Sequence, residues 1–307
     1  MINTNISWEK LGLIIKPNSK IQWMSKWTGA SFAIKSKQKD IFDIYVTGRD
    51  DQNRSLIGII NYNIKSLQVI NIDNHPILNL GVRGAFDENG TSYPWLVRNN
   101  NKLLMYYTGW VPTVLTPFQN HIGLAERKEN EEKFKQTSKA PILERTNEEP
   151  FGTGSVCVIK ENKKWKMWYT CFLGWEESSN KPKHFYNIKY AESTDGIKWI
   201  RKNKTCIDFK DKEEYCIAKP SVIKINNVYH MWYTFRGLEY MIGYASSKNG
   251  IDWVRKDEIV RITTSKNGWD SKSICYPHVF KHEKDLYMLY CGNNYGEEGL
   301  GLAKLKT

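Results

Sequence analysis

A repeated stretch limits what this chain can fold into more than any other feature of its sequence. IKYAESTDGIKW at 188–199 returns in altered form as IGYASSKNGIDW at 242–253. Two apolar runs precede each copy, and similar pairs of runs occur three more times, at 30–50, 93–110 and 276–293. A third run, of the type IGLA or IGYA, follows each pair. The chain therefore consists of five units of about 60 residues, a period that is typical of solenoids and propellers.

The runs within each unit have the length and composition of β-strands. They are short, apolar or alternating, and rich in β-branched and aromatic residues, and polar clusters such as NNNK and ENKK separate the first two runs. We therefore predict four antiparallel strands per unit. Four-stranded units in a radial array form a β-propeller, whose ring leaves only short, protected edges. The expected fold class is all-β, a five-bladed β-propeller.

The two ends of the chain are expected to meet in the last unit. The fifth unit stops at its third strand because the sequence ends at Thr307, whereas LGLIIKP at 11–17 has the pattern of a spare strand. We expect this N-terminal strand to complete the last blade. The chain then forms a single domain, 1–307, with units at about 26–80, 81–145, 146–210, 211–265, and 266–307 together with 8–20.

The turns inside the repeated stretch indicate a structural role. STDGIKW and SKNGIDW place Asp-Gly and Asn-Gly between the third and fourth strands, where a tight turn needs positive φ. The Trp that ends each copy is expected to pack between neighbouring units. We therefore expect the repeats to hold the fold and the chemistry to lie elsewhere.

Composition and charge restrict the partners. Lys and Arg number 45 against 33 Asp and Glu, and the net charge of +12 favours an anionic partner. No nucleic-acid-binding motif accompanies the basic residues. No apolar run approaches the roughly 18 residues of a membrane span, and the N-terminal residues lack the pattern of a secretory signal. Six Cys residues without CxxC spacing are typical of reduced thiols. We expect a cytoplasmic protein.

The sequence contains no cofactor motif. Zinc-ligand spacing, a Walker loop, GxGxxG and GxSxG are all missing. We therefore expect no cofactor. An oxygen-ligated ion in the channel stays open as an alternative that no motif supports.

Carboxylates precede three of the first strands. Asp87 lies in FDENG, Glu149 in NEEPFG and Glu214 in KEEYCIAKP. Residues at this position of a propeller converge at one mouth of the channel, where ligands commonly bind. Cleavage of a glycosidic bond needs two carboxylates, one as acid and one as base or nucleophile. We therefore predict that Asp87, Glu149 and Glu214 are catalytic. Solvated turns are the alternative interpretation.

The loops after the second strands, and the entry to the fifth unit, carry aromatic, basic and polar side chains. These loops are expected on the same face as the three carboxylates. Trp rings can stack on sugars, and Arg side chains can hold a carboxylate or phosphate through paired donors. The predicted substrate contacts are Arg49, Asp50, Trp110, His121, Trp175, His184, Arg236, Tyr276 and Asn293.

The series of motifs resembles a known superfamily. The series runs P-x-V, then MWY, then IKYAES with DGI and Trp, and it is spread over five units. It is similar to the five-bladed β-propeller glycoside hydrolases of families 32, 43, 62, 68, 117 and 130. The run from FDENG through IAKPSV and MWYTFRG to ICYPHVF is most similar to uncharacterised bacterial members, which tend to be encoded among surface-polysaccharide genes.

The resemblance implies a carbohydrate-active protein that acts on a glycosidic bond in bacterial polysaccharide metabolism. It also implies a carboxylate base in the first unit, a second carboxylate, and a Glu acid in the third. Glu149 matches the acid and Asp87 the second carboxylate. The entry to the first unit, KWTGASFA at 26–33, contains no Asp or Glu, which places ordinary inverting hydrolysis in doubt. Asp50 is an irregular substitute for the missing base.

Two other functions stay open. A glycosyltransferase or phosphorylase that uses a nucleotide sugar or a phosphorylated sugar would agree with the net charge and the missing base. A non-catalytic sugar-binding propeller would use the Trp and Arg side chains but not the carboxylates. The expected partner is a carbohydrate in each case, and for the glycosyltransferase or phosphorylase it is anionic or phosphorylated. Fold alone does not separate these functions.

Overall fold

The strands of the computed structural model follow the repeats of the sequence. The structure describes residues 6–128, 131–178 and 182–306. Its strands are β1 (Ile6–Ile15), β2 (Trp27–Lys35), β3 (Ile41–Arg49), β4 (Ser55–Asn63), β5 (Gln68–Ile72), β6 (Thr91–Asn99), β7 (Lys102–Val111), β8 (Gln119–Lys128), β9 (Lys135–Gln136), β10 (Thr153–Glu161), β11 (Lys164–Glu176), β12 (Lys183–Ser193), β13 (Ile200–Ile207), β14 (Cys216–Ile225), β15 (Val228–Arg236), β16 (Tyr240–Ser247), β17 (Val254–Arg255), β18 (Val260–Arg261), β19 (Cys275–His282), β20 (Asp285–Cys291) and β21 (Leu300–Lys306).

Helical structure is confined to short segments in the described residues. These are two 3₁₀ turns, η1 (Gln22–Met24) and η2 (Asp257–Ile259), and the four-residue α1 (Asn293–Gly296). The prediction of an all-β chain is confirmed. No helix in this part of the chain has the length and apolar character that crossing a bilayer requires.

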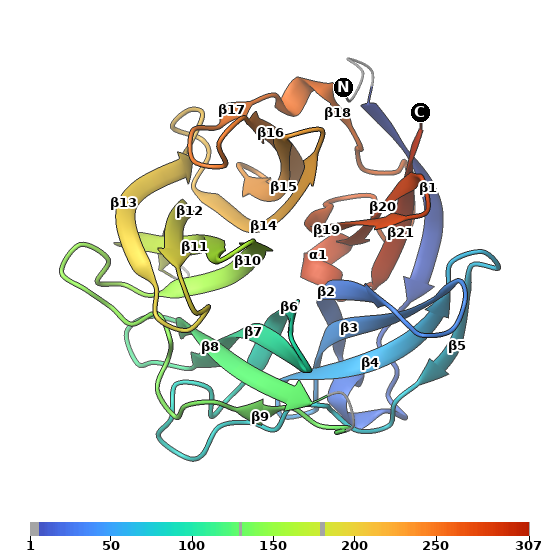
Figure 1. The fold of residues 1–307 in the computed structure, drawn as a ribbon, viewed down its shortest axis with the longest axis horizontal. Coiled ribbons are helices and arrows are strands. Elements are labelled where there is room, and N and C mark those ends of the chain that lie inside the picture. Colours follow the sequence, from blue (N-terminus) through green and yellow to red (C-terminus); the bar gives the residue numbers. More distant parts are fainter. Residues whose placement is uncertain (1–5, 129–130, 179–181, 307) are drawn as a thin grey trace.

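Hydrogen bonds join the strands into groups that lie around a common centre (Figure 1). β2–β5 and β6–β9 each form a four-stranded sheet. β10–β13 and β14–β17 are two further runs of four, which one parallel bridge between Tyr186 and Cys216 joins into a sheet of eight. The last sheet has the order β18-β1-β21-β20-β19. We call these runs the first to fifth strand groups.

The N-terminal strand pairs with the last strand of the chain. β1 runs antiparallel to β21, from Ser7 opposite Lys306 to Ile15 opposite Leu300. Trp8 of β1 is 6% exposed and meets the ring of Trp232 edge-on at 5.9 Å. The two ends of the chain therefore meet in the fifth strand group, as the sequence indicated. Burial of the Trp8 side chain stabilises this closure.

Each turn of the repeated dodecamer binds the strand group that precedes it. The Ser193 and Ser247 hydroxyls accept hydrogen bonds from the backbone N–H of Gly196 and Gly250, both at 2.8 Å. Both glycines have positive φ, +79° and +77°, which Gly adopts without steric cost. The Gly196 carbonyl then accepts a bond from the Tyr106 hydroxyl on β7, and the Gly250 carbonyl one from the indole of Trp168 on β11, both at 2.7 Å. The repeats thus connect neighbouring strand groups.

The outer strands are the least regular part of the fold. β9 and β17 have only two residues each, whereas β13 has eight. Short edge strands present few unpaired backbone groups to other chains. The second strands lie deeper, and Tyr106, Tyr169 and Tyr233 on them are fully buried.

Candidate functional site

The first strands, β2, β6, β10, β14 and β19, all carry a break in register near their start. These irregularities lie between Thr28 and Ser31, Ser92 and Trp95, Thr153 and Val156, Ala218 and Ser221, and Cys275 and His278. Tyr93, Lys219 and Tyr276 occupy the same place in three of them, each before a Pro and with φ of +51°, +52° and +55°. Such bulges redirect side chains.

A cavity of about 540 Å³ opens at these bulges, and all five strand groups contribute to its wall. Its aromatic lining residues are Trp27, Tyr93, Trp110, Phe118, Phe172, Tyr186, Tyr240, Tyr276 and Tyr295. Its basic and imidazole side chains are those of Arg49, Arg236 and His184. No Asp or Glu among the described residues lines the cavity. The site therefore combines aromatic faces with positive charge.

Arg49, at the end of β3, is held by aromatic rings. Its guanidinium carbon lies 4.8 Å from the ring centre of Trp27 and 5.6 Å from that of Trp110. Nη1 donates to the Asn53 side-chain oxygen at 3.0 Å, while the buried Nε has no hydrogen-bond partner within the described part of the chain. Cation–π contacts hold the charge in place without neutralising it.

Arg236, at the end of β15, has similar surroundings. Its guanidinium carbon lies 5.0 Å from the ring centre of Tyr240 and 5.3 Å from that of Tyr215. Nη1 donates to the Tyr295 hydroxyl at 3.2 Å, and the buried Nε again lacks a partner among the residues that the structure describes. Two guanidinium groups from different strand groups thus reach the cavity, and neither has a carboxylate partner in the described part of the chain.

His184, on β12, is a neutral group in the same wall. Burial lowers its pKa to about 4, and the positive charge of Arg236 acts in the same direction. Its ring stacks on Tyr186 with 5.2 Å between the ring centres. The Tyr186 and Tyr240 hydroxyls are hydrogen-bonded to each other at 2.6 Å. Near pH 7 this wall offers hydrogen-bonding groups but no further charge.

The three carboxylates that the sequence predicted to be catalytic do not meet in the cavity, because none of them lines it. Asp87 is buried, and its Oδ2 accepts a hydrogen bond from the Tyr107 hydroxyl at 2.7 Å. Burial raises the pKa of Asp87, with the Tyr107 bond acting in the opposite direction. A Cβ added to Gly81 would lie 1.8 Å from Oδ1, so the carboxylate is packed against backbone.

Glu149 is 2% exposed and has three charged or polar partners. The Tyr169 hydroxyl donates to its two oxygens at 2.8 and 3.0 Å. Lys189 lies at 3.3 Å and Arg201 at 3.1 Å, and both form ion pairs with it. One hydroxyl and two cations of the third strand group therefore hold Glu149 in place.

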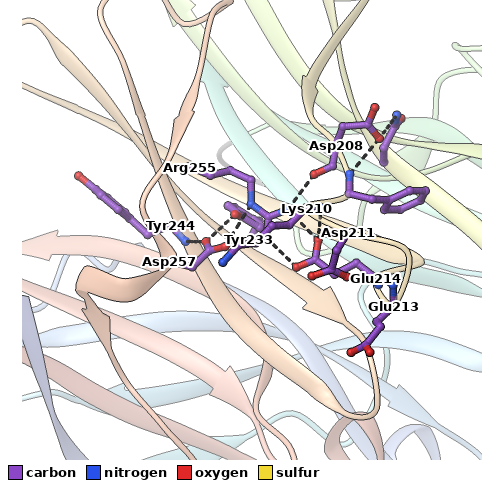
Figure 2. Close-up of polar contacts among 11 residues, drawn as sticks. Asp208, Lys210, Asp211, Glu213, Glu214, Tyr233, Tyr244, Arg255 and Asp257 are labelled. Atoms are coloured by element: carbon purple, nitrogen blue, oxygen red, sulfur yellow. Dashed lines mark hydrogen bonds and ion pairs between the residues drawn. The ribbon is translucent and has the colours of Figure 1, made fainter.

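Glu214 belongs to a network within the fourth strand group (Figure 2). Arg255 donates to its two oxygens at 2.7 and 2.9 Å, and also pairs with Asp257 at 2.6 Å. Asp257 accepts a hydrogen bond from the Tyr233 hydroxyl at 2.6 Å. Figure 2 shows the Arg255 side chain between the two carboxylates, which it links through its forked donors.

A fourth carboxylate, Asp270, follows the same pattern and was missed in the sequence. Its Oδ2 accepts from the Tyr290 hydroxyl at 3.0 Å and pairs with Lys10 at 2.6 Å. The signal was available, because Asp270 precedes its tyrosine by 20 residues, as Asp87 and Glu149 do. Asp87, Glu149 and Asp270 therefore share a hydrogen bond to the second strand of their own group, whereas Glu214 does not, because Tyr233 donates to Asp257 instead.

The predicted substrate contacts divide into two sets. The residues that line the cavity are Arg49, Trp110, His184, Arg236 and Tyr276. The residues that do not are Asp50, His121, Trp175 and Asn293.

The second set has other contacts. Asp50 accepts bonds from the backbone N–H of Gln52 and Arg54 and pairs with the Arg54 side chain. The Asn293 side chain binds the backbone N–H groups of Lys272 and Ser273. Burial lowers the pKa of His121 to about 4, and its side chain lines a separate, shallower pocket. Trp175 lines a neighbouring groove beside Phe118.

Sequence reasoning missed most of the aromatic wall. Tyr93 could have been found, because YPW at 93–95 matches YPH at 276–278, where Tyr276 was predicted. Trp27, the first residue of β2, and Tyr295, in α1, were not predicted from the sequence.

One group of described residues could hold a metal ion. The ligand atoms of Asp40, His282 and Glu283 lie within 4.8 Å of one another. The group lies at the β2–β3 and β19–β20 turns, and none of its members lines the cavity.

Comparisons with known proteins place the chain among propeller proteins. No protein-family model matches it. It is 36% identical over 303 residues to "Uncharacterized protein MT1551" and to "Uncharacterized protein Rv1502", both of Mycobacterium tuberculosis, and the match covers 98% of this chain and 100% of theirs. A shorter match, 35% identical over 83 residues, covers 25% of this chain and 28% of a "1,2-beta-oligomannan phosphorylase" of a Thermoanaerobacter species.

Solved structures agree on the fold. A "Glycoside hydrolase" superposes with a TM-score of 0.77 and 16% identity, over 97% of this chain and 92% of its own. A structure described as showing that "The GH130 family of mannoside phosphorylases contains glycoside hydrolases that target beta-1,2 mannosidic linkages in Candida mannan" superposes with a TM-score of 0.71 and 15% identity, over 97% and 93%. The chain therefore belongs to the family of the two mycobacterial proteins and has the fold of the propeller glycoside hydrolase superfamily of families 43, 32 and 130.

Proposed function

We propose that the protein is a carbohydrate-active propeller that binds a sugar carrying an anionic group in the central cavity. The observation that carries this proposal is the pair Arg49 and Arg236, which line an aromatic cavity that contains no carboxylate among its described residues. The proposal includes a five-bladed single domain with the predicted unit boundaries, which the order of the strand groups supports.

The two kinds of lining group suit two parts of one ligand. Aromatic rings provide flat apolar faces for the C–H groups of a sugar ring, as Trp110 and Trp27 do here. Guanidinium groups bind phosphate or carboxylate through parallel N–H donors. Because Arg49 and Arg236 each keep a buried Nε without a partner in the described chain, an anionic ligand would supply acceptors that the protein does not.

We propose glycosyl transfer to or from phosphate as the reaction. In phosphorolysis a phosphate oxygen bonds to the anomeric carbon while the bond to the leaving oxygen breaks, and a proton passes from the phosphate to that oxygen. No carboxylate base is needed, because phosphate is the nucleophile. The short likeness to an oligomannan phosphorylase supports this reaction class.

Hydrolysis by a carboxylate pair is the second candidate, and the superfamily fold favours it. It requires an acid that is protonated before it acts. The buried Asp87, whose pKa is raised by burial, fits that requirement better than Glu149, which forms ion pairs with Lys189 and Arg201. A glycosidase would then need Asp87 to reach a ligand from its present packed position.

A thermal-shift panel separates these functions. Ligands that bind the folded state raise its stability by mass action, by about 2.7 kcal/mol at a hundredfold excess over Kd. We expect sugar phosphates or nucleotide sugars to raise the Tm, and neutral oligosaccharides of the same sugar to raise it less. A shift with neutral oligosaccharides alone would overturn the proposal and favour the hydrolase.

A further inference from the structure

A fully buried lysine lies next to the wall of the cavity. Lys219 follows Ala218, which lines the cavity, and its backbone N–H donates to the Ser155 hydroxyl at 3.0 Å. In the repeat it occupies the place of Tyr93 and Tyr276, which both line the cavity. Lys219 itself has 0% exposure and a φ of +52°, a strained conformation for a residue with a side chain.

The amine lies beside one ring of an aromatic cluster. Nζ lies 5.4 Å from the ring centre of Trp95. Trp95 packs against Phe32 at 4.9 Å and against His278 at 5.4 Å, and Phe32 and His278 are 4.3 Å apart. These rings come from the first strands of three different groups. The amine therefore lies where the groups converge.

The polar atoms in this cluster lack partners. Among the described residues, Nζ of Lys219 has no hydrogen-bond partner, and the ring nitrogens of His278 have none apart from a weak contact with the Ala33 backbone. Buried polar groups almost always have a partner, from the protein or from an ordered water or ion. Burial lowers the pKa of Lys219 to about 8, so the amine is still mainly protonated at neutral pH. A buried ammonium without a counter-ion is strongly unfavourable.

We infer that Lys219 and His278 bind a small monovalent anion of the halide type between the first strands. The ammonium group and an imidazole N–H are donors, and the anion supplies both the missing acceptor and the missing charge. Water would supply only the acceptor. A monatomic ion suits this place better than an oxyanion, which needs several donors around its oxygens, because Trp95, the ring beside the amine, already donates its indole N–H to the Val158 carbonyl. This inference does not depend on the proposed function.

Bromide in a crystal of the full chain tests the site directly. The expected result is an anomalous difference peak at contact distance from Lys219 Nζ and next to His278. Density at this place without anomalous signal would be water and would overturn the inference. Bromide bound only at surface positions, which is an adventitious ion only, would overturn it as well.

Halide dependence in solution gives a second test. At constant ionic strength, the Tm of the wild type is expected to rise and saturate as chloride replaces methanesulfonate, and Lys219→Met is expected to abolish the rise. Lys189→Met is the matched control, because Lys189 is also buried but pairs with Glu149, and it should keep the chloride effect. If Lys219→Met does not fold, His278→Phe keeps the amine and is expected to weaken the rise. A flat response of the wild type would contradict the inference.

Discussion

The Tyr169 hydroxyl donates to both carboxylate oxygens of Glu149, at 2.8 and 3.0 Å. Tyr107 with Asp87 and Tyr290 with Asp270 repeat this relationship at the same spacing of 20 residues. In these three strand groups the carboxylate joins the entry loop to the second strand. This contact gives Asp87, Glu149 and Asp270 a structural role, whereas Glu214 binds Arg255 instead.

Replacement of Glu149 is therefore expected to act on stability. Glu149→Gln would remove the carboxylate that forms ion pairs with Lys189 and Arg201, and breaking a buried ion pair typically costs about 3–5 kcal/mol. Urea denaturation would show this loss in the free energy of unfolding. The exposed neighbour Glu148→Gln is the control and should stay close to the wild type. A stable Glu149→Gln variant that binds ligand but does not turn it over would restore Glu149 as the acid.

The two cavity arginines are expected to act on binding. Arg49→Gln and Arg236→Gln should each weaken binding of a sugar phosphate by at least about tenfold, since charged hydrogen bonds contribute about 1.5–3 kcal/mol. Arg54→Gln is the matched control, because Arg54 lies close to Arg49 in sequence but pairs with Asp50 and does not line the cavity. Calorimetric titration measures all three variants. If all three variants bound the sugar phosphate with the same affinity, Arg49 and Arg236 would not form the anion site.

Buried histidines are expected to make stability depend on pH. Burial lowers the pKa of His121, His184 and His230 to about 4 from 6.5. Between these two values the unfolded chain binds more protons than the folded chain, so stability falls as the pH falls through this window. At pH 5 unfolding should take up about three protons through these side chains.

The pH dependence of the free energy of unfolding measures this uptake. His121→Gln should lower it by about one proton, and the exposed His75→Gln serves as the control. Stability that is constant from pH 7 to pH 4.5 would show that these histidines are accessible to protons in the folded state.

The closure by the N-terminal strand is expected to dominate the stability of the fifth strand group. Trp8→Ala would leave a hole beside Trp232 and should cost about 3–5 kcal/mol. Leu13→Ala is the control in the same strand, because Leu13 is 40% exposed and should change the free energy of unfolding by less than about 0.5–1 kcal/mol. Equal effects of the two changes would mean that β1 is not a stabilising part of the ring.

The repeats made the strand order predictable, because their spacing is a local property of the sequence. The pairing of β1 with β21 was predictable in the same way, because the fifth unit lacked a fourth strand and LGLIIKP had the pattern of a spare strand. Arg49, Arg236 and Trp110 were also predictable as cavity residues, because they lie at the ends of second strands.

The role of the carboxylates was not predictable in this way. Alignment in the repeat shows that Asp87 and Glu149 occupy corresponding places, but it does not show whether they face the cavity or a tyrosine of their own group. Lys219 was overlooked for a related reason. Its place in the KP dipeptide matches Tyr93 and Tyr276, and only the packing of Trp95 and His278 reveals that its side chain is buried.

The most direct test of the proposed function is a calorimetric comparison of one sugar in neutral and phosphorylated form, titrated into the wild type and Arg236→Gln. The account predicts that the phosphorylated form binds at least about tenfold more tightly to the wild type, and that Arg236→Gln removes most of this difference. Equal affinities of the two forms for the wild type, or a difference that Arg236→Gln leaves unchanged, would contradict it.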